Sequence, residues 1–193
     1  MEWSLIVEMT SLASLFSVAN WPKEYKQSSE TEEKIFLQAY EKMGLINTKK
    51  SVELDGCKKG TICTEGRFKA INCEDLTVHS FGKVEMINSQ AIDVFCGDIA
   101  LLVDTKISGI LECADNSILI DCVVQSLIVR SVLRQGMTPS LAKGKTIYLD
   151  NTIIEGDVTF HATGKIFACE KSRILGSVTN GTIVRSLKGL SKL

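Results

Sequence analysis

Residues 68–72 read Phe-Lys-Ala-Ile-Asn, and residues 84–88 read Val-Glu-Met-Ile-Asn. An apolar residue followed by Asp or Asn recurs on both sides of this pair at near-constant spacing, with one longer step before the last copy. Self-similarity at a short fixed period is the signature of repeat architectures. The acidic or amide positions of this repeat are Asp55, Asn72, Asn88, Asp104, Asp121 and Asp150.

The segments between these positions alternate apolar and polar residues and are rich in β-branched side chains, which is typical of strands. They are too short for helix pairs, and a leucine-rich repeat needs a longer unit with regularly spaced leucines. We therefore expect a mainly β protein, a parallel β-helix (β-solenoid) with about 16 to 17 residues per coil, over residues 52–187.

The repeated Asp and Asn residues are predicted to form one corner of each coil. Both residue types tolerate left-handed backbone and form local hydrogen bonds, and identical corners of successive coils lie above one another. A column of amides forms hydrogen bonds along the axis, whereas adjacent carboxylates repel. A second signature, Ile-x-Gly-x-Val/Leu, predicts another corner, where glycine supplies positive φ or close approach, at Gly109, Gly156 and Gly176.

The longest step of the repeat, from Asp121 to Asp150, contains a basic segment, residues 130–145, with weak strand character. We expect an irregular coil or a protruding loop there. Function is often carried by loops that project from a regular scaffold. The candidate contact residues are Arg130, Arg134, Lys143 and Lys145.

Residues 1–48 are predicted to form a helical N-terminal cap that covers the opening coil. Apolar residues within 3–18 recur at helical spacing, and Ser29 to Glu32 has the pattern of a capping box. We favour docking of this segment on the solenoid, with weak membrane contact through residues 3–18 as the alternative. The charges in and around this segment do not fit a secretory signal peptide or a helix that crosses a bilayer.

Composition excludes several classes of function. The 22 Lys and Arg residues balance 23 Asp and Glu residues, so no net field attracts nucleic acid. The 7 cysteines include no Cys-x-x-Cys pair and no zinc spacing, which predicts free buried thiols, a reducing cytoplasmic location and no metal. The C-terminal Ser-Lys-Leu would act as a peroxisomal targeting signal only in a eukaryotic protein.

No catalytic or cofactor motif is present. His79 and His161 are the only histidines, and both are expected to point outward from strands. Acidic pairs occur at Glu74 with Asp75 and at Glu155 with Asp157, but such pairs on strands usually lie on solvated faces. We expect no catalytic residue, no cofactor and no enzymatic activity.

The segments Asp150 to Val158 and Ile174 to Val178 resemble bactofilins and related small right-handed β-helix proteins. The resemblance covers about residues 52–184. It implies a compact cytoskeletal solenoid that polymerises end to end without nucleotide. It also implies a short apolar segment that meets the membrane, to which Trp3 to Val18 corresponds.

The leading hypothesis is a non-enzymatic scaffold that binds itself or another protein. A carbohydrate-active β-helix, either a hydrolase or lyase or a glycan-binding module, is the second hypothesis. A cluster of outward-pointing charged side chains from adjacent coils would support this second hypothesis. A left-handed hexapeptide acyltransferase is disfavoured, because it needs a strict hexapeptide cadence that this repeat does not follow, and its active site usually uses a histidine.

Overall fold

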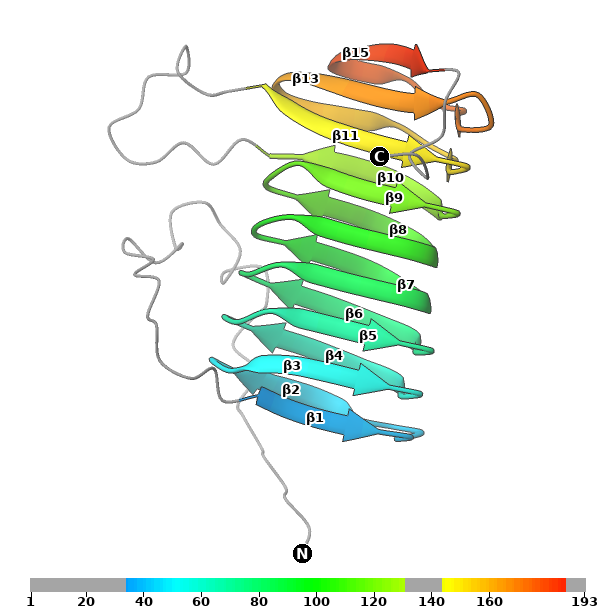
Figure 1. Ribbon diagram of the computed structural model, residues 1–193. Coiled ribbons are helices and arrows are strands. Elements are labelled where there is room, and N and C mark those ends of the chain that lie inside the picture. The colour runs from blue at the N-terminus through cyan, green and yellow to red at the C-terminus, as the bar shows by residue number, and fades with distance from the viewer. Residues whose placement is uncertain (1–33, 131–143, 187–193) are drawn as a thin grey trace, which may run out of the picture. The chain divides into compact units, whose positions relative to one another are not determined.

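The computed structural model describes residues 34–130 and 144–186, which form a parallel β-solenoid of about eight turns (Figure 1). Every strand pair has parallel register, and the strands form one continuous sheet that winds around the axis. The predicted solenoid is confirmed. Most of the predicted N-terminal cap and most of the basic segment, with Arg134 and Lys143, lie outside the described residues.

One side of the solenoid, here called face A, takes one strand from each coil. Its strands, from the N-terminal end, are β1 (Lys34–Gln38), β3 (Ser51–Asp55), β5 (Phe68–Ile71), the first part of β7 (Val84–Cys96), the first part of β8 (Ala100–Cys113), β9 (Ser117–Ile120), β11 (Lys145–Asp150), the second part of β13 (Val158–Cys169) and the second part of β15 (Val178–Ser186).

The remaining strands form the opposite side, here called face B, and run in the reverse direction across it (Figure 1). They are β2 (Gly44–Thr48), β4 (Lys58–Thr64), β6 (Glu74–Ser80), the second parts of β7 and β8, β10 (Val123–Val129), β12 (Ile153–Ile154), the first part of β13, β14 (Arg173–Ile174) and the first part of β15.

The predicted period holds through the regular coils. Equivalent residues of neighbouring coils are 16 or 17 positions apart, as between Asn72 and Asn88. The spacing rises to 30 between Asp121 and Asn151, where the basic segment is inserted, and to 20 between Asp157 and Ser177. The insertion therefore interrupts the chain but not the column of coils.

The core is a column of alternate side chains from every strand. On face A, Leu54, Ala70, Met86 and Leu102 follow one another in register, and each is fully buried. A single coil has no second layer to cover its apolar side, so burial comes from the coils above and below it. Hydrophobic burial and backbone pairing between coils thus stabilise the same arrangement.

The expected helical cap is wrong for residues 34–48, which form β1 and β2 instead. Ile35 and Leu37 alternate with polar or exposed residues and pair with Val52 and Leu54 of β3. The segment carries apolar residues at helical spacing, but its inward side chains, Ile35 and Leu37, follow strand period, and stacking on the next coil decides between the two patterns. The solenoid begins at β1 rather than at residue 52.

Candidate functional site

The acidic and amide corner exists, with a shift at two coils. Asn72, Asn88, Asp104 and Asp121 all have left-handed backbone, with φ of 54°, 47°, 48° and 53°. Each follows the face A strand of its coil. These four predicted residues form a single column along the axis.

Asp55 and Asp150 lie one residue before that column. Asp55 pairs with Ile71, and Asp150 pairs with Ile120, so both still belong to face A strands. The left-handed positions of these coils are taken by Gly56 and Asn151, with φ of 61° and 46°. Glycine and asparagine adopt positive φ at least as readily as aspartate, which explains the shift.

Side-chain hydrogen bonds run along this corner, which we call the corner ladder. The Asn88 amide donates to Asn72 Oδ1 at 2.7 Å, and the Asn72 amide donates to Asp55 Oδ1 at 3.5 Å. Farther along, the Asn151 amide donates to Asp121 Oδ1 at 2.5 Å. Asp104, between the two groups, has no side-chain hydrogen bond within the described part of the chain. The corner ladder is therefore broken at Asp104.

A polar groove with a volume of about 320 Å³ follows the broken part of the corner ladder. One wall consists of the corner residues Asn72, Asn88, Asp104 and Asp121. The other wall consists of residues two positions later in each coil, and small polar side chains form the floor. The remaining lining residues are Cys73, Glu74, Ser89, Gln90, Thr105, Lys106 and Val123.

Beneath the corner lies a column of buried thiols and hydroxyls, which take part in hydrogen bonds in addition to the apolar burial expected of the cysteines. Cys73 Sγ, Ser89 Oγ and Cys122 Sγ each lie against the carbonyl oxygen two residues earlier, at 3.2, 2.8 and 3.1 Å. The Cys73 amide in turn donates to Ser89 Oγ of the next coil at 3.1 Å. Thiol and hydroxyl are thus interchangeable at this position. The described residues include 7 cysteines, all of them free.

At the predicted glycine corner, glycine is needed because the neighbouring coil approaches the backbone closely. None of Gly109, Gly156 and Gly176 has positive φ. A Cβ at Gly109 would lie 2.8 Å from the Ile92 carbonyl oxygen and would collide with Asp93 Oδ1. The Ile110 amide beside it donates to Asp93 Oδ1 at 2.7 Å, so the neighbouring coil occupies the space that a side chain needs.

The two described residues of the predicted contact region take part in ion pairs of the solenoid. Arg130 Nη2 donates to Glu112 Oε2 at 3.0 Å, and Arg130 Nε lies in ion-pair contact with the same carboxylate. Lys145 Nζ lies 3.0 Å from Asp115 Oδ1. Their charges are already matched at the two points where residues 131–143 leave and rejoin the solenoid.

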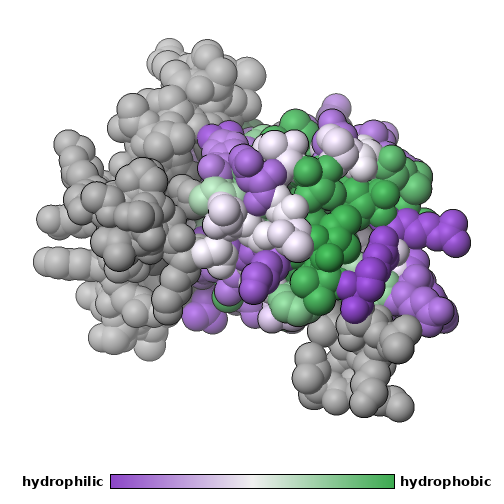
Figure 2. Space-filling view, turned by 90° about the horizontal axis from the view of Figure 1, so that it is seen from above, coloured by the Kyte–Doolittle hydropathy of each residue, from purple (hydrophilic) through white to green (hydrophobic). Residues whose placement is uncertain are grey.

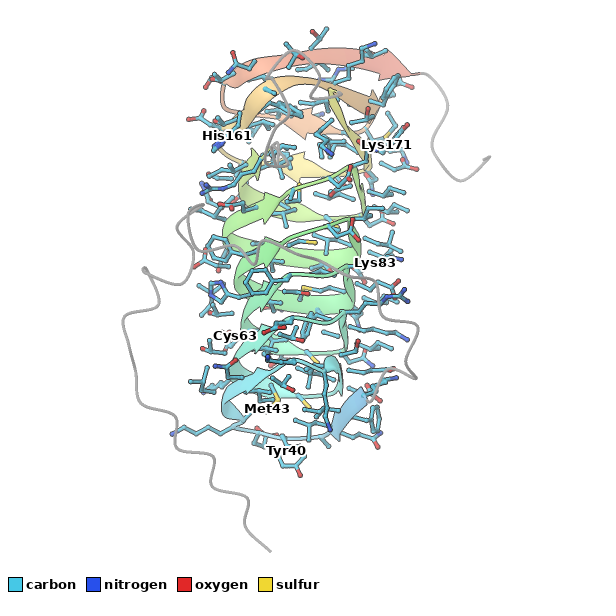
Figure 3. All side chains as sticks on the ribbon, turned by 90° about the vertical axis from the view of Figure 1, so that its left-hand side faces the viewer. Tyr40, Met43, Cys63, Lys83, His161 and Lys171 are labelled. Atoms are coloured by element: carbon cyan, nitrogen blue, oxygen red, sulfur yellow. The ribbon has the colours of Figure 1, made fainter. Side chains whose placement is uncertain are left out.

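The expectation that both histidines point outward to solvent is wrong for His79, which is buried, and holds for His161. His79 is 9% exposed and stacks on Phe95 with ring centroids 4.5 Å apart, and burial lowers its pKa. His161 is exposed near the C-terminal end (Figure 3). Asp157 accepts hydrogen bonds from the Ser177 amide and hydroxyl, both at 2.8 Å, which lower the pKa of that carboxyl. Asp157 therefore stabilises a turn.

Apolar core positions become accessible at both ends of the described solenoid. Figure 2 looks onto the C-terminal end and shows apolar residues gathered there. Ile183 of β15 is 39% exposed, although its in-register neighbour Ile166 in the coil below is fully buried. Val178, in the same coil, is partly exposed, although its in-register neighbour Val158 is fully buried.

The N-terminal end shows the same feature. Ile35 and Leu37 of β1 are partly exposed, although their in-register neighbours Val52 and Leu54 in the next coil are buried. Tyr40, which follows β1, is 51% exposed. Tyr40 and Met43 lie at this end of the solenoid, whereas Cys63 and Lys83 lie along its sides (Figure 3). Among the described strands, β1 pairs only with β3, and β2 pairs only with β4.

Residues 34–130 and 144–186 contain no cluster of three or more His, Cys, Asp or Glu side chains arranged to hold a metal ion. The same residues include no helix with the length and apolarity needed to cross a membrane. Comparison of the chain with protein-family models, with curated proteins and with solved structures finds no match.

Proposed function

We propose that this protein is a non-enzymatic structural scaffold whose solenoids associate end to end. The proposal includes the right-handed winding and the cytoskeletal role that its bactofilin-like repeats imply. A cytoplasmic location and membrane contact through residues 3–18 belong to the same proposal. The observation that carries it is the exposed apolar core at the terminal coils.

The physical reason is that a terminal coil has a neighbouring coil on one side only, whereas every interior coil is covered on both sides. Ile183 loses the cover that makes Ile166 inaccessible to water, and the outer edge of β15 has no described partner strand. Unpaired strand edges with apolar side chains favour pairing with another chain. A second copy supplies a strand edge of the same kind, because β1 and β15 both belong to face A.

Charge supports self-association. The formal net charge of −1 gives little long-range repulsion between copies. A net charge close to zero promotes association at working pH. Long-range charge repulsion between copies therefore does not oppose contact between ends.

Sedimentation velocity over a range of concentrations tests the proposal. We expect the full chain to form concentration-dependent species larger than the monomer. Ile183→Glu and, separately, Val178→Glu place a carboxylate on the C-terminal end and should shift the distribution towards smaller species. Val178 is a useful second site because its side chain is already partly exposed, so a folding defect from the substitution is smaller than at a fully buried position.

Ile92→Glu is the matched control, because Ile92 is 48% exposed on the side of the solenoid. It should leave the distribution unchanged, and far-ultraviolet circular dichroism should show all three variants folded. A strictly monomeric wild type at high concentration would refute the proposal. An equal effect of the control would refute the assignment of the contact to the end.

A further inference from the structure

The groove beside the corner ladder has two chemically different walls. Asp104 and Asp121 place carboxylates on the corner side. Gln90 and Lys106, from the following positions of β7 and β8, place an amide and an ammonium group on the other side. All four residues are exposed, so the groove is open to a ligand from solution.

The centre of the groove has unused hydrogen-bonding capacity. Within residues 34–130 and 144–186, the side chains of Gln90, Asp104 and Lys106 make no hydrogen bond or ion pair. Asn88 directs its amide group to Asn72, on the side away from Asp104. Asp121 presents a second carboxylate, which is an acceptor and repels Asp104.

The charges of the walls select against ions and apolar ligands. The carboxylates of Asp104, Asp121 and Glu74 repel a polyanion. Lys106, together with Lys58, which pairs with Glu74 at 3.4 Å, opposes a metal cation. Among the described lining residues, Val123 is the one aliphatic side chain and none is aromatic, so neither a lipid chain nor a stacked base is favoured. The ligand that fits is neutral and carries donors and acceptors close together.

We propose that this groove binds a neutral glycan. A sugar hydroxyl donates to the Asp104 or Asp121 carboxylate and accepts from Lys106 or the Gln90 amide, which satisfies both walls at once. Charged acceptors and donors make the stronger hydrogen bonds in such a contact. The inference concerns binding alone and does not depend on end-to-end association.

The repeat favours an extended chain rather than a single sugar. Equivalent groove residues follow one another at the spacing of paired strands, about 4.8 Å. Successive sugars along the axis therefore meet equivalent positions of successive coils, whose side chains change from Asn72 and Glu74 at one end to Asp121 and Val123 at the other.

Nuclear magnetic resonance titration of the full chain with cellohexaose, maltohexaose, laminarihexaose and chitohexaose tests this site. We expect at least one of them to bind saturably, with a Kd of about 1 mM or tighter. Shifts should be confined to residues 72–74, 88–90, 104–106 and 121–123. The double variant Gln90→Ala with Lys106→Ala should weaken binding by about fivefold or more, the effect of losing hydrogen bonds to a charged group.

The matched control is Lys165→Ala with Gln125→Ala, which likewise removes one exposed lysine and one exposed glutamine, at positions that do not line the groove. It should leave the affinity unchanged. The proposal is overturned if none of the four saccharides gives saturable shifts, or if the groove variant binds as well as the control. Shifts of these residues by calcium chloride, with none by saccharide, would also overturn it.

Discussion

Replacing Asp104 by Asn should make the protein more stable, because it removes the break in the corner ladder. Asp104 stands between the Asn88 amide and the Asp121 carboxylate without a side-chain partner among the described residues. Asn accepts the left-handed backbone of this position, where φ is 48°, as readily as Asp does. The substitution keeps the shape of the side chain and changes one oxygen into a donor.

The size of the gain follows from two contributions. Two carboxylates at the strand spacing of about 4.8 Å repel by about 0.9 kcal/mol in water. The new amide also donates to Asn88 Oδ1, as Asn88 does to Asn72, which adds about 0.5 kcal/mol at an exposed position. The free energy of unfolding should rise by about 1 to 1.5 kcal/mol, and the melting temperature by roughly 2 to 6 °C.

Urea denaturation of wild type and Asp104→Asn at neutral pH measures this difference. Asp75→Asn is the control. Asp75 is also an exposed aspartate with left-handed backbone, with φ of 54°, but its in-register neighbour in the preceding coil is Lys59 and not a carboxylate. It should give no gain. A variant no more stable than wild type, or an equal gain from Asp75→Asn, would refute the reasoning.

Three further outcomes are expected from denaturation measurements. Gly109→Ala should lower the free energy of unfolding by about 1 to 3 kcal/mol, since its Cβ would collide with Asp93; an unchanged midpoint would contradict close packing. Cys122→Ser should cost less than Cys122→Ala, because serine keeps the hydrogen bond to the Ile120 carbonyl; the reverse order would disprove this role. Burial raises the pKa of Cys113 to about 12 from 9.0, so the unfolded chain ionises first and stability should fall as pH rises from 9 towards 12. Cys113→Ser should flatten that fall, and an unchanged pH dependence would count against burial as its cause.

The corner shows how far sequence alone can place a repeat. Asn72, Asn88, Asp104 and Asp121 were predicted as one column, because each is the single residue of its coil that suits left-handed backbone after an apolar strand. Two coils contain adjacent candidates, Asp-Gly at 55–56 and Asp-Asn at 150–151. Only the strand register shows that the second residue of each pair makes the turn.

The first coil was misassigned for a different reason. Ile35 and Leu37 alternate as in a strand, yet the same segment carries apolar residues at helical spacing after a capping box. Local propensity does not decide between these patterns. Pairing with β3 does, and that is a tertiary interaction.

The thiol and hydroxyl column was visible in the sequence but was not recognised. Cys73, Ser89, Thr105 and Cys122 each follow the corner residue directly. Exchange among Cys, Ser and Thr at one position of a repeat indicates a shared hydrogen bond rather than apolar burial alone. The groove could not be predicted from the sequence, because its second wall depends on the direction in which the side chains after the corner point.

Electron microscopy of the full chain at high concentration tests the scaffold proposal most directly. Eight coils at about 4.8 Å each give a solenoid about 38 Å long. We predict rods several times this length, in which the coil repeat continues across each junction between copies. Uniform particles of single-solenoid length at every concentration would contradict it.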